Sequence, residues 1–81
     1  MAGYIIMEIK ILSPKKTLFK GRAESVTLPG KEGEFQILKD HATIFSLLGR
    51  GQISLDKNKK IPISQGILEV RDNKITILIK N

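Results

Sequence analysis

The stretch from Ile67 to Ile79 reads I-L-E-V-R-D-N-K-I-T-I-L-I, two largely apolar arms joined by a polar pair. In both arms an apolar residue stands at every second position, which is the period of a β-strand with one buried face. Asp72 and Asn73 separate the arms, and both residue types tolerate the positive φ angles of a tight hairpin turn. The stretch therefore predicts an antiparallel hairpin. The side chains expected to face inward are Leu68, Val70, Ile75, Ile77 and Ile79.

The same period recurs through most of the chain, and isoleucine, whose branched side chain suits a strand, dominates the apolar residues. Strands are expected over 5–12, 17–20, 22–28, 34–38, 67–71 and 74–79, with others around 53–55 and 61–63. A bend is expected at Gly21, and Pro62 indicates an edge strand. The segment Ile44–Leu48 is apolar on both faces and fits either a strand or one helical turn. The fold class predicted is all-β: a small antiparallel sandwich or flattened barrel of about 8–10 short strands.

Composition limits the chemistry that the chain can perform. Its 81 residues form one small domain, residues 1–81, and contain no cysteine and a single histidine. Disulfides, thiolate catalysis and a zinc site built from several histidines are thereby excluded. The net charge of +6 raises the question of an anionic partner, but the basic residues are scattered along the sequence.

Three features that resemble reactive sites are better explained by structure. His41 has only the adjacent Asp40 as an orienting carboxylate and lacks a nucleophile, so we interpret it as a loop or interface residue. Glu32 and Glu34 lie in a glycine-flanked loop, where nothing in the sequence would raise one pKa relative to the other. The glycines of that loop lack the Gly-Lys-Ser/Thr ending of a phosphate cradle.

Nucleic-acid binding agrees with the charge and the all-β pattern, since small basic barrels bind oligonucleotides. Such barrels stack bases on exposed aromatic side chains. This chain has four aromatic residues, and Phe35 and Phe45 stand at positions expected to be core. A small basic nucleic-acid-binding barrel therefore remains the alternative function.

Two motifs and two shorter segments carry a resemblance to a known family. The first motif reads S-V-T-L-P-G-K-E-G-E-F-Q-I-L over 25–38 and is followed by His41-Ala42. The second reads I-S-Q-G-I-L-E-V over 63–70 and continues as N-K-I-T-I-L over 73–78. M-E-I-K-I-L-S-P over 7–14 and F-K-G over 19–21 match in the same order. Together they resemble the epsilon subunit of F-type ATP synthases, although Lys39-Asp40, Thr43 and Gln65 depart from its pattern.

The resemblance implies a non-catalytic rotor subunit of the central stalk that links the gamma subunit to the c-ring and couples proton or sodium flow to ATP synthesis. It implies a c-ring contact at Glu32, Gly33 and Glu34, and a gamma contact at His41, Ala42 and Ile44. Structural turns are expected at Gly30, Gly66, Asp72 and Asn73. No cofactor, metal, nucleotide or nucleic acid is expected to bind.

Members of this family commonly continue as a pair of helices, and the chain ends at Asn81. We therefore expect a single sandwich domain without that helical part. The expected location is the cytoplasmic face of a bacterial inner membrane, with membrane contact only through the complex.

Overall fold

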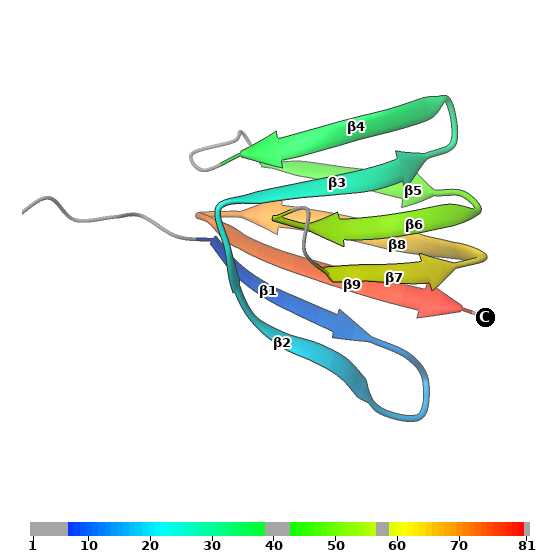
Figure 1. Ribbon diagram of the computed structural model, residues 1–81, viewed down its shortest axis with the longest axis horizontal. Coiled ribbons are helices and arrows are strands. Elements are labelled where there is room, and N and C mark those ends of the chain that lie inside the picture. Colours follow the sequence, from blue (N-terminus) through cyan, green and yellow to red (C-terminus); the bar gives the residue numbers. More distant parts are fainter. Residues whose placement is uncertain (1–6, 39–42, 57–58, 81) are drawn as a thin grey trace, which may run out of the picture.

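The computed structural model describes residues 7–38, 43–56 and 59–80, and the regular elements within them are β-strands (Figure 1). Their bounds are β1 (Met7–Leu12), β2 (Thr17–Ala23), β3 (Ser25–Gly30), β4 (Gly33–Leu38), β5 (Ile44–Leu48), β6 (Gly51–Leu55), β7 (Lys59–Ile63), β8 (Gln65–Arg71) and β9 (Lys74–Lys80). The all-β prediction is confirmed. The segment that fitted either a strand or a helical turn is strand β5.

The strands form a hydrogen-bonded sheet in the order β2-β1-β9-β8-β5-β3-β6-β7, with β4 paired to β3. Between β5 and β3 the register holds one residue pair, Gly30 with Leu48, and the sheet curls at this narrow junction (Figure 1). One half, β2-β1-β9-β8-β5, thereby packs against the other, β4-β3-β6-β7. Both halves contribute to one core, made of Met7, Ile9, Ile11, Ala23, Val26, Leu28, Ile37, Leu48, Ile53, Leu55, Ile63, Leu68, Val70, Ile75, Ile77 and Ile79.

The hairpin predicted from the sequence is β8 and β9. Asp72 and Asn73 form its turn with φ angles of 48° and 61°, and the five side chains expected to face inward are at most 3% exposed. β7, which contains Pro62, lies at the end of the sheet as predicted.

The turn expected at Gly66 is not found, because Gly66 is the second residue of β8. A Cβ there would lie 2.7 Å from the carbonyl oxygen of Leu78, so close strand approach accounts for this glycine.

One strand pair runs in a direction that the sequence pattern did not predict. β1 and β9 are parallel, with residue pairs from Glu8–Lys74 to Leu12–Leu78, whereas the other registered pairs are antiparallel. Alternation of apolar residues is the same for either direction of pairing. Strands joined by a tight turn must be antiparallel, but β1 and β9 come from opposite ends of the described chain and have no such constraint.

The bend expected at Gly21 is wrong: β2 continues through this glycine to Ala23. A Cβ at Gly21 would lie 2.9 Å from the ring of Phe19, so the glycine makes room for that ring. The chain turns instead at Glu24. There the carboxylate of Asp56 accepts hydrogen bonds from the backbone N–H of Glu24 at 3.0 Å and of Ser25 at 3.0 Å. These bonds join the end of β6 to the corner between β2 and β3.

Candidate partner-binding surfaces

The outer face of β1, β9, β8 and β5 carries apolar side chains where an exposed sheet usually carries polar ones. Leu47 pairs with Ile67, Ile67 with Leu78, and Leu78 with Leu12, so these four residues lie side by side across four strands. We call them the apolar row. Directly opposite residues in neighbouring strands have Cβ atoms about 5 Å apart. The row is therefore a continuous apolar strip on the surface.

The apolar row is open to solvent. Leu47 is 52% exposed, Leu78 49% and Ile67 36%, and these three side chains line a shallow groove of about 420 Å³. Phe45, two residues before Leu47 on the same face of β5, is 70% exposed. The expectation that Phe45 belongs to the core is wrong, because β5 turns Ile44 and Leu48 inward and Phe45 outward. Contiguous exposed apolar surface of this kind is typical of sites that contact another protein, a membrane or a ligand.

The turn between β3 and β4 carries the acidic pair singled out in the sequence. Lys31 and Glu32 form the turn, and Gly33 opens β4 with a φ of 135°, which favours glycine. Gly30 closes β3, where a Cβ would lie 2.7 Å from the carbonyl oxygen of Gly33. Glu32 and Glu34 are both exposed. The two glycines thus allow a tight turn that presents two carboxylates to solvent.

The acidic turn and the apolar row are neighbours. Glu32 and Glu34 line a shallow depression of about 670 Å³ together with Phe45 and Leu47. The structure therefore brings residues from two distant stretches of sequence to one part of the surface. Phe35, also in this depression, is partly buried against the core.

The gamma contact predicted from the resemblance falls mostly outside the described residues, since His41 and Ala42 lie there. Ile44 is described, and it packs partly against the core. Sequence reasoning missed the apolar row. One available signal was that Ile44–Leu48 is apolar on both faces, because a strand with a single buried face needs apolar residues on that face alone.

The described residues contain no cluster of three or more His, Asp, Glu or Cys side chains that could hold a metal ion. Over the same ranges, no helix is long and apolar enough to cross a membrane. The arrangement offers a curled sheet with an exposed apolar strip and an acidic turn, which suits binding to other proteins.

Comparison with known proteins agrees with this geometry. Residues 6–81 match the family model described as ATP synthase, Delta/Epsilon chain, beta-sandwich domain. The chain is 37% identical over 78 residues to the ATP synthase epsilon chain of Sulfurimonas denitrificans, covering 91% of this chain and 60% of that one. With the epsilon chain of Leptospira borgpetersenii it shares 39% identity over 75 residues, 89% of this chain and 59% of the relative. The chain thus spans about three fifths of the length of these curated relatives.

Solved structures share the fold. A chain of the Euglena gracilis mitochondrial ATP synthase, from a structure of its OSCP, F1 and c-ring, superposes with a TM-score of 0.82 at 20% identity. That match covers 98% of this chain and 53% of the other. A chain from the central stalk and c-ring of the Tetrahymena thermophila enzyme gives a TM-score of 0.76 at 19% identity, covering 93% and 63%. The resemblance inferred from the sequence motifs is confirmed, and the chain belongs to the family of ATP synthase delta/epsilon β-sandwich domains.

Proposed function

We propose that this chain is the β-sandwich part of a non-catalytic rotor subunit in the central stalk of an F-type ATP synthase. The observation that carries the proposal is the family match over residues 6–81, which includes all the described strands. In this role residues 1–81 act as one domain that links the gamma subunit to the c-ring and couples proton or sodium flow to ATP synthesis. The matched Tetrahymena chain comes from a central stalk and c-ring, which agrees with such a position.

The packing of the fold supports this role. A part that transmits rotation must resist deformation, and here both halves of the sheet pack on one core rich in isoleucine and valine. Branched side chains have few rotamers, and close-packed interiors transmit strain rather than absorb it. The domain performs its role by holding two partners in a fixed relation, without chemistry of its own.

The relatives are named as ATP synthase epsilon chains, components of a membrane-associated complex. We propose that this chain works at the cytoplasmic face of a bacterial inner membrane, and that it reaches the membrane only through the complex. No cofactor or nucleotide takes part in this role.

The proposed role requires a stable complex with gamma. When the chain is mixed with the gamma subunit of the same organism, we expect the two proteins to elute together from a size-exclusion column in equimolar amounts. Single-stranded DNA serves as the comparison, because a nucleic-acid-binding barrel would bind it with an affinity that falls steeply with salt. Binding to the DNA without binding to gamma would replace the rotor proposal with the nucleic-acid alternative.

We propose that Glu32, Gly33 and Glu34 contact the c-ring, whose exposed loops, as the family resemblance implies, carry arginine. An exposed carboxylate can accept paired hydrogen bonds from a guanidinium group. Glu34→Gln removes the charge with little change in shape, so we expect about tenfold weaker binding of the gamma–epsilon complex to the c-ring. Surface plasmon resonance on c-rings in detergent measures this. Glu24→Gln makes the same charge change at the corner between β2 and β3, and equal behaviour of the two variants would contradict the assignment.

We further propose that the gamma contact includes the apolar row, alongside His41, Ala42 and Ile44. β5 begins two residues after Ala42 and carries Leu47 of the row on its outer face. The contact implied by the resemblance would thus lead directly into an exposed apolar strip.

A further inference from the structure

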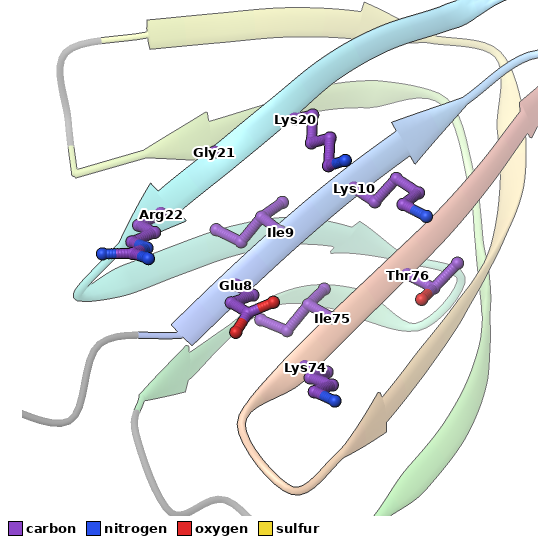
Figure 2. A pocket seen from close by; sticks show the side chains of 9 residues that line it. All are labelled: Glu8, Ile9, Lys10, Lys20, Gly21, Arg22, Lys74, Ile75 and Thr76. Atoms are coloured by element: carbon purple, nitrogen blue, oxygen red, sulfur yellow. The ribbon is translucent and has the colours of Figure 1, made fainter.

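The outer face that carries the apolar row becomes strongly basic towards the start of β1. Two registered rows lie there: Lys10 stands between Lys20 and Thr76, and Glu8 stands between Arg22 and Lys74. Figure 2 shows these side chains on β2, β1 and β9 around a shallow groove of about 590 Å³. We call this feature the basic groove, defined by Glu8, Lys10, Lys20, Arg22, Lys74 and Thr76.

The charges of the basic groove do not balance. Glu8 lies opposite both Arg22 and Lys74, so this row places one carboxylate beside two cations. Lys10 has Lys20 directly opposite on one side and the hydroxyl of Thr76 on the other. Like charges directly opposite in a sheet destabilise it. The greatest excess of positive charge therefore lies at Lys10 and Lys20, where an anionic group would relieve the repulsion.

The spacing of the groove suits an extended chain. Lys20 and Arg22 are two residues apart on one face of β2, which places their Cα atoms about 7 Å apart. Alternate side chains of an extended peptide have this same separation. Carboxylates on one face of such a peptide would match the cations along β2, and those near Lys10 would gain the hydroxyl of Thr76 as a further donor.

The neighbouring surface decides which kind of anion fits best. Leu12 follows Lys10 by two residues on β1, and Leu78 follows Thr76 by two residues on β9, so groove and apolar row form one face. A partner on this face must cover apolar and basic surface together. A second copy of the chain would bring a further net charge of +6 to the contact. A nucleic acid would match the cations but leave the leucines uncovered. Bases would also find few stacking partners, because Phe45 is the one largely exposed aromatic side chain among the described residues.

We propose that the basic groove binds an acidic, extended segment of the protein that covers the apolar row. This proposal rests on the proposed function in one respect, because there the covering protein is the gamma subunit. The acidic segment lies along β2, with carboxylates beside Lys20 and Arg22 and within reach of Lys10 on the neighbouring strand. It steers the encounter of the two proteins and sets their register, as complementary charge does at other interfaces.

The groove can be tested without the partner by titrating the ¹⁵N-labelled chain with a twelve-residue oligoglutamate peptide. We expect the largest amide shifts at Lys10, Lys20 and Thr76, and their loss in the double variant Lys10→Glu/Lys20→Glu. The variant Lys15→Glu/Lys60→Glu makes the same change in net charge at exposed sites outside the groove, and it should keep the shifts. Shifts spread evenly over all lysines, or no shifts, would overturn the proposal. Tighter binding of a twelve-nucleotide DNA to the same residues would also overturn it in favour of a nucleic acid.

The same variants are then compared for binding to gamma. At low salt we expect Lys10→Glu/Lys20→Glu to bind gamma about tenfold more weakly than Lys15→Glu/Lys60→Glu, with a weaker dependence on salt. Equal affinities for the two variants would overturn the groove while leaving the rotor role intact. Failure of the unaltered chain to bind gamma would contradict the rotor role, and the peptide titration would still decide whether the groove binds an acidic segment.

Discussion

Leu68→Ala is expected to lower the free energy of unfolding by about 3 kcal/mol, because it opens a cavity in the core between the two halves of the sheet. Leu68 is fully buried on β8 and pairs with Ser46 of β5 and Ile77 of β9. Domains of this size have little stability in reserve, typically about 5–15 kcal/mol. The loss should therefore lower the melting temperature by about 15 °C. Urea and thermal unfolding followed by circular dichroism measure both quantities.

The matched control for this variant is Leu78→Ala on the adjacent strand β9. It deletes the same atoms from a side chain that is 49% exposed on the outer face. Little new cavity forms there, so we expect a loss of less than about 1 kcal/mol. If the two variants lost equal free energy, the assignment of inner and outer faces to β8 and β9 would be wrong.

Leu78→Asp is expected to weaken binding to gamma about 30-fold, which corresponds to about 2 kcal/mol. The substitution places a carboxylate in the centre of the apolar row, between Ile67 and Leu12. On association this charge would lose water without gaining a partner, and a few central residues carry most of the energy of a protein contact. Isothermal titration calorimetry with purified gamma measures the affinity. The unfolding transition should change little because the side chain already faces solvent.

The comparison that tests this surface is Leu38→Asp. Leu38 is 51% exposed and ends β4, in the opposite half of the sheet. The substitution makes the same chemical change at the same exposure, next to the segment that contains His41 and Ala42. An effect of Leu38→Asp on gamma binding as large as that of Leu78→Asp would show that the apolar row is not the centre of the contact.

Features that depend on neighbouring residues could be predicted from the sequence. The alternation in 67–79 and the turn residues Asp72 and Asn73 correctly predicted a hairpin and its buried face, because both signals act within a few residues. Pro62 correctly indicated an edge strand, since proline lacks the backbone N–H that a residue in an interior strand donates to a neighbouring strand. The family resemblance was equally readable, since it rests on the order of residue types.

Features that depend on distant strands could not be predicted in this way. The parallel direction of β1 and β9 leaves no trace in the alternation of either strand. The role of Gly21 depends on the position of the Phe19 ring, and the turn at Glu24 depends on Asp56, which is far along the chain. The position of Phe45 in the sequence predicted a core residue. The sheet instead uses Ile44 and Leu48 of β5 for that purpose.

By itself, the order of residues determined an all-β domain, its principal hairpin and its family, because strand period and turn chemistry are local properties of the chain. Only the tertiary structure decided which outward-facing side chains become neighbours. The apolar row and the basic groove each combine residues from three or four strands, and their contiguity follows from strand order and register. Register is set when the buried faces of distant strands pack together, so the surface that results is a consequence of the core.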